Sequence, residues 1–347
     1  MANLSYRKAG LVLGKTRTNA SDRQIRDLQR DLRCLGYLDR GIDGNFGGAT
    51  ERAVRALQFD LLNNHGKSNG TDGAAPISVL DYNRSRVVAI TGEADQGLAG
   101  CIADMLDDAT FAKLPQVQDP VAENRRIVAE IAAMLSTNVP IPFLVAILRQ
   151  ESSLKHFNEP RSGDEDTFIV IGLDTNSTDK HIITSRGYGA GQYTLFHHPP
   201  SRKEVSDFML DVAKNLQKAV RELREKFDKF VNGPTSGTRA DDRQPEYGNG
   251  TLRFCKYGAG DPLYMKDCAA CAKQAGTQDI KAGITPMYAG SKNTYQPTRY
   301  YKTASYQGVP IRKNFPCDWP YAVRRYNGAG INSYHYQAKI LQNLSSK

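Results

Sequence analysis

The sequence lacks any long run of apolar residues. Hydrophobic residues make up 40% of the 347 positions, yet no run approaches the ~20 residues that a membrane-spanning helix needs. The best N-terminal candidate, residues 9–13, is too short for the hydrophobic core of a signal peptide. The sequence therefore predicts neither a membrane span nor an ordinary secreted precursor.

Long runs of positive charge are also missing. The chain has 46 basic and 37 acidic residues, a net charge of +9. Residues 1–115 hold 15 basic and 14 acidic side chains, which leaves +8 on residues 116–347. A basic half suggests a polyanionic partner: nucleic acid, an anionic membrane or an anionic wall polymer. Because acidic residues interrupt every basic stretch, we do not expect a nucleic-acid partner.

Motifs for cofactors and metals are absent as well. No phosphate-cradling glycine loop leads into a helix that carries Lys-Ser or Lys-Thr. His197 and His198 are adjacent, but no His-x-x-x-His or paired carboxylate accompanies them. We therefore expect no cofactor, and packing or solvent-facing roles for the two histidines.

The cysteines are few and unevenly placed. Four of the six fall in the second half, with the spacing Cys-x12-Cys-x2-Cys followed by one more: Cys255, Cys268, Cys271 and Cys317. A zinc ribbon would need a second closely spaced pair, so two disulfides are favoured and zinc remains the alternative. Cys34 and Cys101 either pair with each other or are simply buried.

Hydrophobic periodicity predicts a mainly α fold. In the first half, apolar residues recur at helical spacing from residue 25 to 35, after Ser21 as N-cap and before Gly36. Thr50 is expected to cap a second helix, a third covers residues 95–106, and residues 115–120 read as a linker.

The second half is predicted to be α+β. Helical patterns cover residues 127–134, 142–151, 205–231 and 334–344, and residues 168–172 and 181–184 alternate as a small hairpin. Residues 233–318 are rich in Gly, Pro and Tyr, so we expect a large irregular insertion. This gives two domains, residues 1–115 and 116–347.

Glu151 is the most informative residue. It follows Ile147 by four positions and Leu148 by three, so its carboxylate lies on the apolar face at the end of a helix. One interpretation is a structural glutamate that pairs within the core. The other is a general acid, because a carboxyl in an apolar pocket can stay protonated near neutral pH and protonate a glycosidic oxygen.

Three motifs in order support the second interpretation. Glu151-Ser152, the segment Gly187-Tyr188-Gly189-Ala190-Gly191-Gln192 and the segment Tyr326-Asn327-Gly328 resemble those of lytic transglycosylases and goose-type lysozymes. The resemblance covers residues 120–200 and 318–345 and implies a lysozyme-like domain. It implies cleavage of the β-1,4 bond between N-acetylmuramic acid and N-acetylglucosamine. It assigns acid/base catalysis to Glu151 and substrate binding or positioning to Ser152, Tyr188, Gln192, Tyr326 and Asn327.

The glycines and the second carboxylate leave alternatives open. Gly187, Gly189 and Gly191 would let the backbone approach a glycan strand, or they form a tight hairpin turn. Ala190-Gly191 departs from the larger apolar pair that is usual in the family. Asp174 is the first choice for a second carboxylate, although an Asx turn explains it equally well. Hydrolysis and transglycosylation are therefore not separated.

The first half carries its own resemblance. The pattern that runs from Ile25 through Leu35-Gly36-Tyr37 and Asp43-Gly44-x-Phe46-Gly47 to Leu57-Gln58 resembles the three-helix peptidoglycan-binding domain. The resemblance implies a groove for wall peptide or glycan, with Tyr37, Asp43 and Phe46 as ligand contacts. A three-helix bundle without a ligand is the alternative.

Together these features predict a modular enzyme that degrades peptidoglycan. The alternatives are a noncatalytic wall-binding protein with a lysozyme-like fold and a chitinase-like glycosidase. Without an export signal, we expect the protein to reach the periplasm or cell wall by lysis, as a phage endolysin, or through a dedicated secretion system. In the second case a cognate immunity protein is expected.

Overall fold

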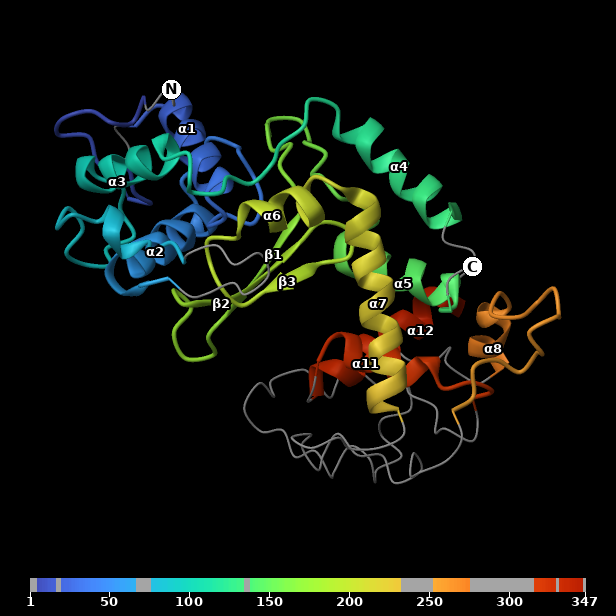
Figure 1. Cartoon of the computed structure of the whole chain (residues 1–347). Coiled ribbons are helices and arrows are strands. Elements are labelled where there is room, and N and C mark those ends of the chain that lie inside the picture. The colour runs from blue at the N-terminus through green and yellow to red at the C-terminus, as the bar shows by residue number, and fades with distance from the viewer. Residues whose placement is uncertain are drawn as a thin grey trace. The chain divides into compact units, whose positions relative to one another are not determined.

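The computed structural model describes residues 5–16, 20–66, 76–133, 138–231, 252–274, 315–328 and 331–345. It is rich in helices and contains one small antiparallel sheet (Figure 1), as a mainly α prediction requires. The chain divides into two compact units. Unit 1 comprises residues 1–128 and 155–215, and unit 2 comprises residues 129–154 and 216–347. The predicted domain division at residue 115 therefore differs from the packing units, because residues 155–215 pack with the N-terminal helices.

The first two helices of unit 1 begin differently. Helix α1 (Asp22–Cys34) starts with a capping box, in which Ser21 and Gln24 exchange side-chain and backbone hydrogen bonds. It ends before Gly36, whose φ of +80° suits glycine. Both ends agree with the sequence prediction. Helix α2 (Gly48–Asn63) begins after Gly47 without a side-chain cap. Thr50 lies inside it and hydrogen-bonds the preceding turn, so its predicted capping role is wrong.

The remaining N-terminal elements complete a helical core. A 3-10 turn, η1 (Leu80–Tyr82), is followed by α3 (Gln96–Asp107), whose N-cap Asp95 accepts a hydrogen bond from the backbone N–H of Leu98. The predicted third helix is thereby confirmed within one residue. Residues 67–75, between α2 and η1, lie outside the described residues.

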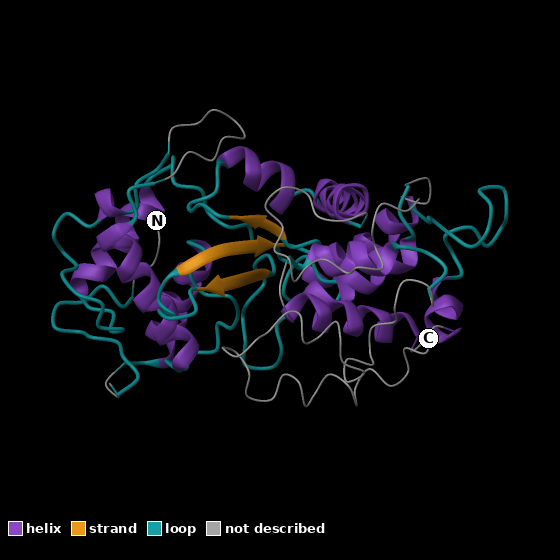
Figure 2. Cartoon of the chain, turned by 90° about the horizontal axis from the view of Figure 1, so that it is seen from below, coloured by secondary structure: helices purple, strands orange, loops and turns teal. Residues whose placement is uncertain are grey.

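A three-stranded sheet forms the other part of unit 1. Its strands are β1 (Ile171–Thr175), β2 (Ile183–Tyr188) and β3 (Tyr193–Leu195), antiparallel in the order β1-β2-β3 (Figure 2). The predicted hairpin is present, with a third strand that was not expected. The segment predicted as a linker is hydrogen-bonded to the approach to β1: Ile169 donates to Pro115 and Val117 donates to Thr167. It is therefore ordered packing and not a free linker.

The long helix predicted over residues 205–231 is interrupted. A short helix α6 (Arg202–Glu204) opens with a capping box at Ser201, continues as a π-helical turn over Val205–Met209, and stops at Leu210. Helix α7 (Val212–Phe230) then starts with Asp211, whose side chain accepts from the backbone N–H of Lys214. A new N-cap inside an apolar pattern therefore divides one predicted helix.

Unit 2 is a helical cluster around stacked aromatic rings. It contains α5 (Ile141–Ser152), most of α7, α8 (Cys268–Gln274), α11 (Trp319–Tyr326) and α12 (Ile331–Ser345). The ring of Trp319 stacks on Phe227 with centroids 4.1 Å apart, and its indole N–H donates to the carbonyl of Phe254 at 3.0 Å. Helices α8 and α11 lie where the sequence predicted irregular chain or no element. Within the insertion, residues 232–251 and 275–314 lie outside the described residues.

Helix α4 (Pro120–Ala133) precedes α5 and matches its predicted amphipathic pattern. Ile127 and Ile131 are buried, whereas Met134 lies outside the described residues. Among the described helices, none is both long enough and apolar enough to cross a bilayer.

Candidate functional site

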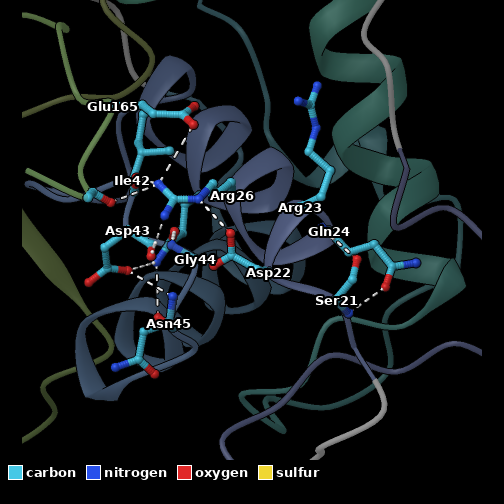
Figure 3. Close-up of polar contacts among 12 residues, drawn as sticks. Ser21, Asp22, Arg23, Gln24, Arg26, Ile42, Asp43, Gly44, Asn45 and Glu165 are labelled. Atoms are coloured by element: carbon cyan, nitrogen blue, oxygen red, sulfur yellow. Dashed lines mark hydrogen bonds and ion pairs between the residues drawn. The ribbon is translucent and has the colours of Figure 1, made fainter.

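The turn at residues 41–46 is fixed by one arginine of α1. The guanidinium of Arg26 donates to the carbonyls of Ile42 at 2.7 Å, Asp43 at 3.0 Å and Gly163 at 2.9 Å (Figure 3). Its Nε atom is 2.9 Å from the carboxylate of Asp22. One side chain thus joins α1, the turn and a segment 137 residues later.

Gln29 of the same helix holds the turn through its amide. It donates to Asp43 Oδ1 at 2.8 Å and to Thr50 Oγ1 at 3.1 Å, and it accepts from the backbone N–H of Gly44. Gly44 has φ of +77°, and a Cβ there would lie 1.7 Å from Asp22 Oδ1. Only glycine fits that position.

The predicted wall contacts differ sharply in exposure. Tyr37 is 1% exposed and donates its hydroxyl to Asp60 at 2.8 Å, and burial raises its pKa well above the ordinary value. Phe46 is 6% exposed. These two side chains belong to the hydrophobic core and cannot contact a wall polymer, which corrects their predicted role. Asp43 is exposed.

An acidic segment covers the arginine face of α1. Arg33 and Asp166 form an ion pair at 3.0 Å with side chains 0% and 2% exposed. Asp166 also accepts from the backbone N–H of Gly41, and Asp164 accepts from that of Ile42 at 2.7 Å. Sequence reasoning missed this contact. Its signal was the spacing of arginines 26, 30 and 33, which places three cations on one helix face, opposite the run Asp164-Glu165-Asp166.

Unit 1 also carries an open groove beside α2 and η1, with an empty volume of about 930 Å³. Val88 in its wall is 84% exposed, and Arg84 places its guanidinium 3.4 Å from Asp104. Arg84 and Ser85 both have positive φ, 45° and 61°, a conformation that non-glycine residues adopt mainly where the surroundings enforce it. The groove is lined by Leu61, Leu62, Leu80, Asp81, Asn83, Arg84, Ser85, Val87 and Val88.

In unit 2, Glu151 ends a strained helix. Helix α5 stops at Ser152, and the next two residues, Ser153 and Leu154, have φ of 58° and 61°. The hydroxyl of Ser152 is buried and donates to the carbonyl of Leu148 at 2.9 Å. Ser152 thus separates the predicted catalytic residue Glu151 from two left-handed non-glycine residues, and such strain often marks functional sites.

Two tyrosines lie within the electrostatic reach of Glu151. The pKa of Tyr326, at the end of α11, is raised well above its ordinary value by burial and by the charge of Glu151. The pKa of Tyr336, in α12, is raised by burial and by the same charge. The structure thus brings together two of the three predicted motifs. Tyr336 was missed, because the motif Tyr326-Asn327-Gly328 ends before it.

The remaining predicted residues of this unit are peripheral. Asn327 is exposed and forms the C-cap of α11. A further carboxylate, Glu222 of α7, also raises the pKa of Tyr326, and it pairs with Lys226 at 2.7 Å. The sequence did not predict that Glu222 lies near Tyr326, because in the sequence it is one of several charged residues on an amphipathic helix.

The Gly-x-x-Gln segment lies in unit 1. Gln192 has φ of +50° and donates its side-chain amide to the carbonyl of Gly189 at 2.8 Å. A Cβ on Gly172 or Gly187 would lie 2.5 or 2.6 Å from Gln192 Oε1. The glycines therefore make room for the glutamine, a use that the sequence analysis did not foresee. Tyr188 is fully buried.

His156 explains another glycine of the segment. A Cβ on Gly189 would lie 2.4 Å from the imidazole, and the backbone N–H of Ala190 donates to Nδ1 at 3.2 Å. The other ring nitrogen, Nε2, lies 2.9 Å from the carbonyl of Met209 and therefore carries the proton. Burial lowers the pKa of His156 to about 4.

Asp174 is exposed and lies within β1, where it accepts from the hydroxyl of Ser185 at 2.7 Å. The turn that follows β1 is built by Asn176, whose side chain accepts from the backbone of Thr178. The Asx turn predicted at Asp174 thus belongs to Asn176. Asp174, Tyr188 and Gln192 belong to unit 1 and Glu151 to unit 2.

No metal centre is apparent among the described residues. No group of three or more His, Cys, Asp or Glu side chains there could hold a metal ion. None of the six cysteines is disulfide-bonded in this structure, so neither a Cys34–Cys101 pair nor the disulfides expected among Cys255, Cys268, Cys271 and Cys317 are formed in it. Burial raises the pKa of Cys34 to about 12 and that of Cys101 to about 11.

Comparisons with known proteins address only the N-terminal part. Searches among curated proteins and among solved structures give no significant match. Residues 21–61, which comprise α1, the turn held by Arg26 and most of α2, match the family model of the peptidoglycan binding domain, and this domain indicates association with the cell wall.

Proposed function

We propose that the chain is a peptidoglycan-cleaving enzyme in which Glu151 is the general acid/base for the β-1,4 bond between N-acetylmuramic acid and N-acetylglucosamine. The observation that carries the proposal is the grouping of Glu151 with Tyr326 and Tyr336, which come from three different helices. Residues 21–61 supply the association with the wall.

The surroundings of Glu151 suit proton transfer to a glycosidic oxygen. Its carboxyl group is half-buried and lies near the buried phenol of Tyr336 and the partly buried phenol of Tyr326, where charge is poorly solvated. Helices α11 and α12 both pack against α5, and a carboxyl group held in place by such packing suits a general acid. Ser152 and Asn327, at the two helix ends, are candidates for contacts to the sugar.

Two reaction types fit these residues. An inverting hydrolase needs a second carboxylate that activates water, and Asp174, an exposed residue that accepts a hydrogen bond from Ser185, is the candidate that the sequence offers. A lytic transglycosylase needs no second carboxylate, since the 6-hydroxyl of the muramic acid attacks its own anomeric carbon. The products identify the reaction, because transglycosylation leaves anhydro ends and hydrolysis leaves reducing ends.

The decisive experiment is release of soluble muropeptides from purified sacculi. The Glu151→Gln variant keeps the shape of the side chain but cannot exchange the proton, so release should fall by about 10²–10⁴-fold. Asp174→Asn is the companion variant, which lowers release only if water attack needs that carboxylate. Unchanged release by Glu151→Gln would show that the catalytic assignment is wrong.

A noncatalytic wall-binding protein is the second candidate, because the family match covers only the binding domain. It predicts sacculus binding without muropeptide release by the intact chain. For binding, we propose the groove beside α2 as the wall contact. Arg84→Glu should weaken sacculus pull-down, whereas Arg40→Glu, at a side chain 84% exposed outside the groove lining, should not.

A further inference from the structure

Four cysteines of unit 2 meet at one pocket with an empty volume of about 280 Å³. Cys268 and Cys271 are three residues apart on α8, so their side chains lie on the same face of that helix. Cys255 comes from the segment before α8, and Cys317 comes from the segment just before α11. All four line the pocket, together with Phe254, Met265 and Trp319.

Contacts to Met265 connect two of these cysteines. The backbone N–H of Met265 donates to Cys255 Sγ at 3.3 Å, and Cys268 Sγ donates to the carbonyl of the same residue at 3.7 Å. Cys317 is buried beside Cys268 and Cys271, whose nearby charges add to burial in raising its pKa. Three chain segments therefore bring their thiols to one place.

Two other uses of such a cluster fit less well. A redox-active Cys-x-x-Cys pair needs an accessible thiol of lowered pKa, whereas burial raises the pKa of both Cys268 and Cys271. A structural zinc site needs four sulfurs that converge tetrahedrally, and among the described residues no cysteine-containing group is arranged to hold a metal.

We propose that the pocket is an oxidation site, in which two disulfides join α8 to its flanking segments, one to Cys255 and one to Cys317. The inference rests on the proposed wall association, since the compartments outside the cytoplasm are oxidising. Each bond forms by thiol–disulfide exchange: two thiols lose two protons and two electrons, and the disulfide of a small oxidant such as oxidised glutathione becomes two thiols. Because Cys268, Cys271 and Cys317 are buried and Cys255 is partly exposed, exchange proceeds during folding or local opening.

The bonds would act on the region that carries Tyr326. Cys317 precedes Trp319, the first residue of α11, by two positions, and α11 ends at Tyr326. A link from Cys317 to α8 would fix the start of that helix and reduce the entropy of the unfolded chain. Reduction should therefore loosen the same helices that hold Glu151.

The test uses the intact chain folded in a buffer of reduced and oxidised glutathione. Denatured protein should titrate as two thiols, Cys34 and Cys101, in place of the six of the reduced form. Peptide mapping should find links between α8 and each flank. Reductant should then lower the unfolding temperature of unit 2 by roughly 5–15 °C.

Variants separate the proposal from general effects of cysteine loss. Cys317→Ser should lose one link and part of the shift on reduction, while the control Cys34→Ser should keep both links and the full shift. Six titratable thiols after oxidation would overturn the proposal. So would a Cys268–Cys271 link, or one zinc ion per chain bound to four intact thiols. Thiol mapping does not depend on muropeptide release, so it can fail or succeed independently of the proposed activity.

Discussion

Residues 155–215 are held on the N-terminal helices by buried charge, whereas unit 2 packs around aromatic rings. In unit 1 the ion pair of Arg33 and Asp166 is inaccessible to solvent, and Arg186 lies 5.2 Å over the ring of Tyr37. In unit 2 the corresponding central contact is the stack of Trp319 on Phe227. Buried charges tolerate few arrangements, because each must keep its partner, while apolar cores tolerate many.

The peptidoglycan-binding domain includes more of the chain than the residues that match the family. Residues 21–61 match the family, but the face of α1 that carries Arg26 and Arg33 is completed by residues 163–166. A fragment ending at residue 115 would leave Arg33 without its carboxylate. The part of the chain that folds as one piece around these helices is therefore unit 1.

The largest expected effect comes from breaking the buried pair. Asp166→Asn removes the charge that Arg33 faces, and loss of one partner of a buried ion pair costs about 3–5 kcal/mol. Urea unfolding of unit 1 should show this loss. Glu165→Gln is the matched control, since the Glu165 side chain is 48% exposed beside Arg30 and its loss should cost less than about 1 kcal/mol. Equal effects of the two variants would contradict the assigned role of burial.

The second effect is a pH dependence confined to unit 1. The pKa of His156 in the folded chain is about 4, below the ~6.5 of an unfolded chain, because burial disfavours the cation. Between these values the unfolded state binds the extra proton, so stability is lost as pH falls from about 6.5 to 4, by up to about 3 kcal/mol. Protonation would also turn Nδ1 into a donor that faces the N–H of Ala190.

The measurement is the free energy of unfolding at pH 7.5 and pH 5 for the native chain and for His156→Gln. The variant cannot titrate, so its stability should change less between the two pH values. A change as large as that of the native chain would assign the pH dependence to other groups.

A third, smaller effect tests the aromatic surroundings of Glu151. Tyr336→Phe keeps the ring in the core but removes the buried hydroxyl that lies near Glu151. Muropeptide release should fall by about tenfold through kcat, equivalent to ~1.4 kcal/mol in the barrier, with a shifted acid limb in its pH profile. A merely structural tyrosine would change stability and leave the pH profile in place.

The smallest effect compares the left-handed residues of the two units. Ser153→Gly in unit 2 and Ser85→Gly in unit 1 both relieve φ near +60°. Relief of strain should outweigh the entropic cost of glycine, so each should stabilise its unit by about 0.5–1 kcal/mol in thermal unfolding. If the strain at Ser153 positions Glu151, only that variant should also slow muropeptide release.

Local signals in the sequence predicted local structure well. Ser21, Gly36 and Asp95 mark helix ends that the structure confirms, because capping depends on neighbouring residues alone. The helix expected over residues 205–231 was wrong, since Asp211 starts a new helix inside a continuous apolar pattern.

Long-range pairing was beyond the sequence. The contact of Arg33 with Asp166 joins residues 133 positions apart. The spacing of the arginines indicates a cationic helix face but not which carboxylates pair with it. The glycines of the Gly-x-x-Gln segment indicated that a group lies close to the backbone, but the sequence did not identify that group as the side chain of Gln192. At the candidate site, Glu151 was identified by its place on an apolar face, whereas Tyr336 could be found only once α12 was packed against α5.

The ion pair of Arg33 also sets an order of events during synthesis. On the ribosome, α1 emerges 133 residues before Asp166. At a synthesis rate of 5–20 residues per second, Asp166 is added roughly 7–27 s after Arg33. The N-terminal helices therefore leave the exit tunnel as an incomplete fold, which is completed only after the acidic segment has been synthesised. During this interval the arginine face of α1 is unpaired, and binding of a chaperone would matter most then.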